Sequence, residues 1–198
     1  MQALAMLDAI VEEEWADRYF SFNAHWAPGM QMGSMRNGQG DDLFAVFDAA
    51  GCFVRGFDHE SAMSPWRHTP PTIWPGVLDQ VPAQFKSSVE EPAFHNGDTT
   101  FCLWCQADDS TWRTGTIDHP PEEDPDGSAW MLWYYQDEPE AYSEFARHYF
   151  EIDLPVGLIT RVYRHEPLSP ALLQEFGTQR SYQEVAIDAA EIGYPVTP

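Results

Sequence analysis

The stretch DLFAVFDAAGCFVRGFD, residues 42–58, indicates the fold class of this chain. Its two halves, 42–48 and 52–58, alternate apolar side chains with other residues, and a period of two is typical of β-strands. The Ala-Ala-Gly between them is short enough to form a turn. We therefore predict an antiparallel β-hairpin, which is the building unit of a sheet with one buried face.

The neighbouring sequence extends this sheet in both directions. Residues 30–42 contain Asn37-Gly38, a turn dipeptide that follows a candidate strand. Downstream, 99–107 and 111–117 predict a second hairpin with a turn at 108–110. The aromatic segment AWMLWYY, 129–135, predicts one more strand. Two hairpins plus this strand make an antiparallel sheet of about five strands.

Helices are predicted at both ends of the chain. Apolar residues recur every three or four positions over 4–22, which predicts one amphipathic helix that ends before His25. The predicted C-terminal helices are 137–151 after the candidate N-cap Asp137, 169–177 between Ser169 and Gly177, and a third that begins with the capping-box pattern of 181–184. The order helix, sheet, helices predicts an α+β fold, and we expect a single domain over 1–198.

Charge is the strongest compositional feature. Acidic residues number 32 against 10 basic ones, which gives a formal net charge of −22. Phosphate backbones and anionic membranes are bound through basic patches, so nucleic-acid and membrane partners are disfavoured. A negative field of this kind attracts a basic protein partner instead. No motif indicates a cofactor, and the oligomeric state is left open.

The cellular compartment is suggested by the cysteines and by the N-terminal residues. The chain has three cysteines, an odd number, and its first twenty residues lack the basic region of a signal peptide. No apolar run approaches the roughly 18 residues that a membrane helix needs. We therefore expect a protein of the reducing cytoplasm.

The best chemical lead is the triplet Asp58-His59-Glu60 at the end of the 42–58 hairpin. With Arg36 or Asp41 in addition, these residues form a candidate acid–base or metal site of a metal-dependent hydrolase. His59 and Glu60, with Cys105, are the candidate metal ligands. The alternative is a polar network that only closes the strand end, because the chain lacks the H-E-x-x-H spacing of a helical zinc site.

The pair Cys102 and Cys105 has C-x-x-C spacing, but it lies in a predicted strand, where positions three apart point to opposite faces. Redox pairs lie at helix N-termini, so we interpret both as core cysteines. A metal site that uses Cys52, or a histidine, as a further ligand is the alternative.

The segment 118–126 concentrates acidic residues without any lysine or arginine, and these are Asp118, Glu122, Glu123, Asp124 and Asp126. Their spacing differs from that of a calcium-binding loop. One interpretation is a solvated loop; the other is an acidic edge that recognises a basic protein.

The stretches MGSMRNGQGDD and GFDHESAMSP, together with EPAF and EIGY, resemble a bacterial family of uncharacterised cytoplasmic proteins. The similarity covers most of the chain and brings no known activity with it. In size, acidity and lack of a catalytic motif the chain is also similar to immunity proteins, which cover the active surface of a toxin. This resemblance implies a non-enzymatic acidic interaction protein, with the hydrolase centred on Asp58, His59 and Glu60 as the alternative.

Overall fold

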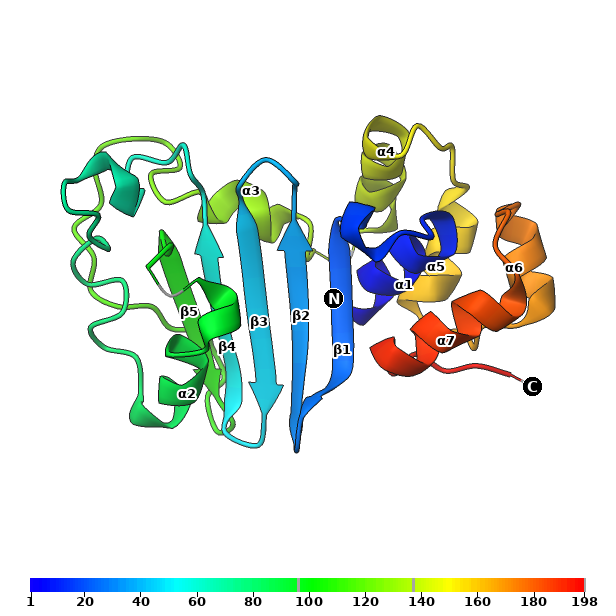
Figure 1. Cartoon of the computed structure of the whole chain (residues 1–198), viewed down its shortest axis with the longest axis horizontal. Coiled ribbons are helices and arrows are strands. Elements are labelled where there is room, and N and C mark those ends of the chain that lie inside the picture. Colours follow the sequence, from blue (N-terminus) through cyan, green and yellow to red (C-terminus); the bar gives the residue numbers. More distant parts are fainter. Residues whose placement is uncertain (96, 137, 198) are drawn as a thin grey trace. The chain divides into compact units, whose positions relative to one another are not determined.

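The alternating residues of 42–58 form strands β3 (Asp42–Asp48) and β4 (Gly51–Phe57), which pair antiparallel in the computed structural model (Figure 1). The predicted hairpin is therefore confirmed. The structure describes residues 1–95, 97–136 and 138–197.

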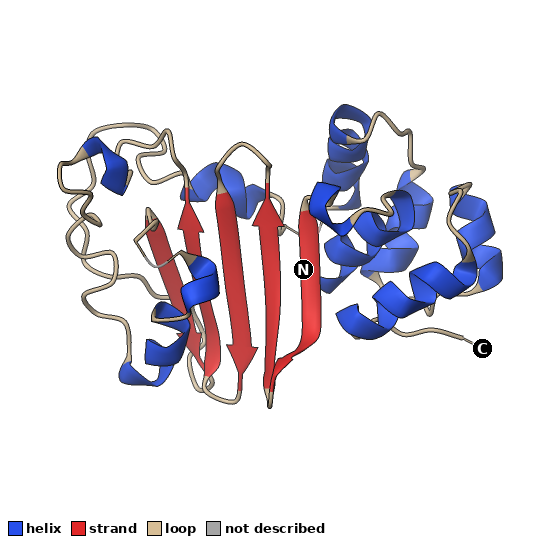
Figure 2. Ribbon diagram, in the orientation of Figure 1, coloured by secondary structure: helices blue, strands red, loops and turns tan. Residues whose placement is uncertain are grey.

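Three more strands complete one sheet with the order β1-β2-β3-β4-β5, shown in red in Figure 2. They are β1 (Phe20–Ala27), β2 (Met30–Arg36) and β5 (Phe101–Gln106). Strands β2 to β5 are joined to their neighbours by antiparallel ladders. In chain order, an N-terminal helix, an antiparallel five-stranded sheet and several C-terminal helices confirm the predicted α+β class.

One face of this sheet is covered by the irregular segment 63–94. The side chains of Phe53, Cys102 and Trp104 pack with Met63, Val77 and Phe85 from this segment. A second cluster unites Met32, Phe44 and Val46 with Phe94. Burial of these large apolar side chains, at roughly 1.5–3 kcal/mol each, holds the proline-rich segment against the strands.

The helices are α1 (Gln2–Val11), α2 (Lys86–Val89), α3 (Ser128–Trp133), α4 (Pro139–Tyr149), α5 (Val156–Tyr163), α6 (Pro170–Phe176) and α7 (Tyr182–Ile192). The predicted caps of the last two are confirmed. Ser169 accepts a hydrogen bond at the start of α6, Gly177 ends it in the left-handed conformation, and Ser181 and Glu184 form a capping box on α7. The predicted cap Asp137 lies outside the described residues.

The predicted helix over 4–22 was wrong beyond Val11. The backbone turns extended at Glu12, with φ −124° and ψ 123°. The guanidinium of Arg18 then donates to the main-chain carbonyls of Glu12 and Glu13, at 2.9 Å each. Residues 20–27 also alternate with a period of two, and as β1 they join the sheet.

The predicted strand over 129–135 was also wrong, because most of this segment forms α3. The carboxylate of Asp124 accepts hydrogen bonds from the backbone N–H groups of Ala129 and Trp130, and that of Asp126 accepts one from Ser128. These acids satisfy the free N–H groups of a helix start, which favours a helix over a strand.

The second predicted hairpin is not formed, because only its first strand is present, as β5. From 111–117 only Arg113 forms a bridge, with Trp104. The chain then leaves the sheet, and Thr116 forms side-chain hydrogen bonds with Gln80. Gly115 lies so close to the carbonyl of Gly76 that a Cβ atom would be 1.9 Å from that oxygen.

The chain divides into two compact units. One, the helical unit, comprises 1–24 and 134–198; the other, the sheet unit, comprises 25–133. The expectation of a single domain over 1–198 stays a prediction.

A buried carboxyl group organises the helical unit. Asp8 of α1 is fully buried and accepts hydrogen bonds from the backbone N–H of Phe20 and the hydroxyl of Tyr142, both at 2.7 Å. It thereby links α1, β1 and α4. Burial raises the pKa of Asp8 to about 7, although these hydrogen bonds act in the opposite direction.

Among the described residues, none of the helices combines the length and the apolar character that crossing a membrane requires.

Candidate functional site

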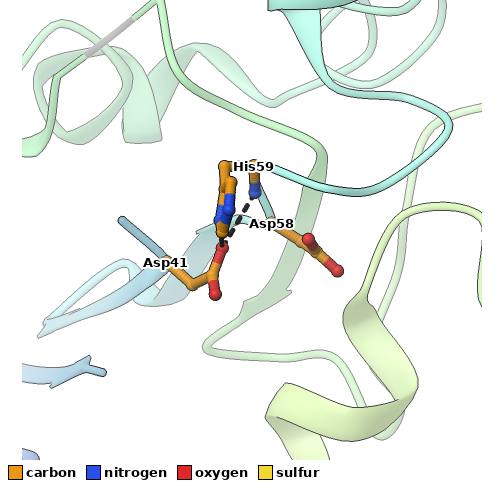
Figure 3. Close-up of side chains that lie close together, drawn as sticks. All are labelled: Asp41, Asp58 and His59. Carbon is orange, nitrogen blue, oxygen red and sulfur yellow. Dashed lines mark hydrogen bonds and ion pairs between the residues drawn. The ribbon is translucent and has the colours of Figure 1, made fainter. Parts of the chain in front are cut away.

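The register of the sheet brings the candidate residues together. Asp42, which opens β3, lies opposite Phe57, which ends β4. Asp41 and Asp58, the next residues outward, therefore leave the sheet at the same end. His59 follows directly, and Figure 3 shows its ring above the Asp41 carboxylate.

Asp41 and His59 form a hydrogen-bonded dyad. Nδ1 of His59 lies 2.6 Å from Oδ1 of Asp41, and the backbone N–H of His59 donates to the same oxygen at 2.8 Å. The amide of Asn37 donates to the other oxygen of Asp41 at 2.5 Å, and its own oxygen accepts from the Asp41 N–H. The turn at 37–41 thus holds the buried carboxylate in place.

The dyad has a defined electrostatic character. The hydrogen bond to Asp41 raises the pKa of His59 above its ordinary value, and the nearby Glu60 and Asp58 carboxylates act in the same direction. The side chain of His59 is 42% exposed. A carboxylate that fixes Nδ1 leaves Nε2 available to transfer a proton or to bind a metal.

Asp58 has a mostly local role. Its carboxylate accepts hydrogen bonds from the backbone N–H groups of Glu60 and Ser61, and from the indole of Trp130 at 3.0 Å. In Figure 3 it is turned away from the dyad toward α3. Asp41, Asp58 and His59 still each offer one ligand atom within 4.8 Å of the others, so together they could hold a metal ion.

The other predicted site residues are placed differently. Oε1 of Glu60 lies 3.9 Å from Nε2 of His59, and this side chain is largely exposed. Arg36 ends β2 opposite Asp42, so it belongs to the same end of the sheet.

Cys105 is not brought to His59. Phe101 pairs with Gly56 near the dyad, whereas Cys105 pairs with Cys52, about 13 Å further along the strand. The predicted ligand set of His59, Glu60 and Cys105 therefore needs correction, because the extended strand separates its members. Cys102 and Cys52 are buried free thiols, and burial raises the pKa of each to about 12.

The acidic segment 118–126 has two parts. Asp118, Glu122 and Glu123 are exposed, as an acidic recognition edge requires. Asp124 and Asp126 are instead engaged at the N-terminus of α3, and Asp126 is buried. Three of the five predicted binding residues are therefore available to a partner through their side chains.

This end of the sheet also holds a second polar cluster, which was not predicted from the sequence. Arg55, which is 2% exposed, lies 3.3 Å from Asp42, and burial raises the pKa of Asp42 to about 6. His95 approaches Asp42 at 3.9 Å. The available signal was a single arginine inside the apolar strand CFVRGF, which requires a buried counter-charge.

A scan against protein-family models finds no match for this chain, and neither curated proteins nor solved structures give one. The resemblance to a bacterial cytoplasmic family and to immunity proteins stays a prediction.

Proposed function

We propose that this protein is a non-enzymatic acidic interaction protein that binds a basic protein partner. The observation that carries this proposal is how the chain uses its own cations. Among the described residues, at least seven of the ten basic residues pair with the protein's own carboxylates, and these are Lys86, Arg18, Arg55, Arg113, Arg147, Arg161 and Arg180.

This internal pairing leaves the acidic excess directed at solvent. Arg67, near the dyad, donates to the main-chain carbonyls of Glu60 and Ser61, so these oxygens hold its guanidinium against the loop. A surplus of exposed carboxylates raises the association rate with a basic protein and repels polyanions. Binding followed by occlusion of the partner's surface is the mechanism that the similarity to immunity proteins implies.

The acidic loop supplies a direct test. The double variant Glu122→Gln, Glu123→Gln is expected to slow association with the basic partner by about threefold, because it removes two exposed charges from the steering field. The matched control is Glu13→Gln, Glu14→Gln, two exposed acids of the helical unit. The partner is first captured on immobilised protein at about 50 mM salt, and rates are then measured by surface plasmon resonance as salt is raised.

Two results would contradict this proposal. One is association with the same rate at low and high salt, which removes electrostatic steering. The other is the recovery of acidic or neutral partners only.

The Asp41–His59 dyad supports a second candidate, a metal-dependent hydrolase centred on Asp58, His59 and Glu60. The specific observation is a histidine that is oriented through Nδ1 by a buried carboxylate while its Nε2 lies 3.9 Å from the exposed carboxylate of Glu60. Asp41 and Asp58, with His59, would hold the metal, which would supply Lewis-acid activation of water. Asp41 and Asp58 thus replace Glu60 and Cys105 of the predicted ligand set, and His59 is common to both sets.

Elemental analysis of tag-free protein after dialysis tests this candidate. About one zinc or manganese per chain is expected, and His59→Gln should lower metal affinity and hydrolysis of p-nitrophenyl phosphate or acetate by at least about tenfold. His148→Gln, an exposed histidine of α4, is the control. A metal-free wild type that does not regain metal from a zinc solution, or metal retained in full by His59→Gln, would exclude the site.

A further inference from the structure

An open hollow of about 370 Å³ lies on the sheet unit along the segment 68–75. Its walls are mostly apolar, from Pro70, Ile73, Trp74 and Pro75, and are completed by the polar residues His68, Thr69 and Thr72. Thr72 at its edge is held by its backbone N–H, which donates to the carbonyl of Pro65, and by its hydroxyl, which donates to that of Pro70. The hollow is thus part of an ordered segment.

Trp74 gives the hollow a fixed aromatic wall. Its indole N–H donates to the main-chain carbonyl of Asp118 at 3.1 Å. Ile73, Trp74 and Ile117 also pack against the core cluster of Phe53 and Phe85. The ring therefore cannot turn without loss of both a hydrogen bond and core contacts.

The same hydrogen bond places the main chain of Asp118, the first acid of the segment 118–126, beside Trp74. Asp118 is in contact with the edge of Trp74 through its main chain, and its side chain is exposed. Glu122 and Glu123, also exposed, follow four and five residues later. A mostly apolar cavity with an aromatic wall, on a protein with a large excess of carboxylates, complements a side chain that has an apolar stem and a positive end.

We propose that this hollow receives an arginine side chain of the basic partner. The inference rests on the proposed function and names its anchoring contact. Charge complementarity with a protein of net charge −22 selects a cationic occupant over an apolar one. Arginine fits better than lysine because its planar guanidinium stacks on an indole and is more weakly hydrated than an ammonium group.

The first measurement uses hexa-arginine and hexa-lysine peptides as probes, because they carry the same charge. Binding is followed by NMR through the indole N–H signals of the tryptophans, and Trp74→Phe identifies the Trp74 signal. Hexa-arginine is expected to shift this signal strongly and to bind about threefold more tightly than hexa-lysine. The exposed Trp112 is the internal reference and is expected to shift less.

Variants at the edge of the hollow provide the second measurement. Thr72→Lys places a cation at the entrance, and it should weaken hexa-arginine binding by about three- to tenfold. Thr72→Glu should strengthen it, which keeps the test valid if the lysine variant folds poorly. Gln174→Lys, with the same charge change on α6 of the helical unit, should alter affinity by less than about twofold.

The outcomes separate this inference from the proposed function. A wild type that binds neither peptide, even at about 50 mM salt, would remove the basic-partner function itself. If both peptides bind with equal affinity and the Trp74 signal does not move, the basic-partner function is retained. The proposal that the hollow binds an arginine of that partner is then wrong. Equal losses in Thr72→Lys and Gln174→Lys would overturn it as well.

Discussion

Replacement of Gly56 by alanine is expected to destabilise the sheet unit by about 2–3 kcal/mol, a cost typical of overpacking in a buried site. Gly56 lies opposite Phe101 in the β4–β5 ladder, and a Cβ atom at Gly56 would lie 2.2 Å from the ring. Phe101 is buried, so the ring has no free space into which it can move. The strand must separate locally, or the ring must leave its rotamer.

Urea denaturation monitored by tryptophan fluorescence measures this effect. Phe101→Leu is the matched partner, because a shorter side chain makes room for the added methyl group. The double variant should lose less stability than the sum of the two single variants, with a coupling of about 1 kcal/mol or more.

Gly157→Ala is the control for the Gly56 substitution. Its added methyl group meets no atom within 4 Å, and alanine favours the helix by roughly 0.5–1 kcal/mol over glycine. A loss of stability at Gly56 no larger than about 0.5 kcal/mol, or simple additivity with Phe101→Leu, would show that the ring does not occupy this space.

Asp8→Ala is expected to have the largest effect in the helical unit, a loss of about 3 kcal/mol, since two buried donors lose their acceptor at roughly 1–3 kcal/mol each. These donors are the backbone N–H of Phe20 and the hydroxyl of Tyr142. Asp8→Asn should be tolerated far better. Its amide oxygen can accept from Phe20, and its amide nitrogen can donate to the Tyr142 oxygen.

The pH dependence of this site has a definite sign. The pKa of Asp8 is about 7 in the folded protein and 3.8 in its ordinary state, so between these values the folded protein holds the extra proton. The neutral carboxyl group contributes fully to the free energy of unfolding below about pH 4, and this contribution is lost as the pH rises through about 7. Wild-type stability relative to Asp8→Asn should therefore fall across this window.

Urea denaturation of both proteins at several pH values between about 4 and 8 measures that difference, which can change by up to about 1.4 kcal/mol per pH unit. The comparison with Asp8→Asn removes the pH dependence of the many other carboxylates, because both proteins share them. A constant difference between the two proteins would show that Asp8 titrates alike in the folded and unfolded states.

Local patterns predicted those parts of the fold that depend on nearby residues. The 42–58 hairpin follows from alternation, and the caps at Ser169, Gly177 and Ser181 follow from side chains within three or four positions of the groups they satisfy. Asp124 and Asp126 obey the same capping rule. The aromatic composition of 129–135 nevertheless suggested a strand, since aromatic side chains suit both a strand and a buried helix face.

The candidate site was predictable in part. Asp41 was considered with Asp58, His59 and Glu60, and it is the carboxylate that holds the His59 ring. Cys105 was included because a thiol is a common metal ligand, and residue type carries no information about which end of a strand lies near a distant residue. The ion pair of Arg55 and Asp42 was not predicted because its two members lie on different strands, β4 and β3.

The sequence by itself determined the α+β class, the hairpin, the capped C-terminal helices and the large excess of acidic residues, since these depend on composition and short-range periodicity. Only the tertiary structure decided that 20–27 is a strand, that Cys105 lies far from His59, and that the indole of Trp74 donates a hydrogen bond to the main chain of Asp118. The physical reason is that such contacts join residues distant in the chain. Their free energy comes from the burial of whole faces against one another, which no short window of sequence contains.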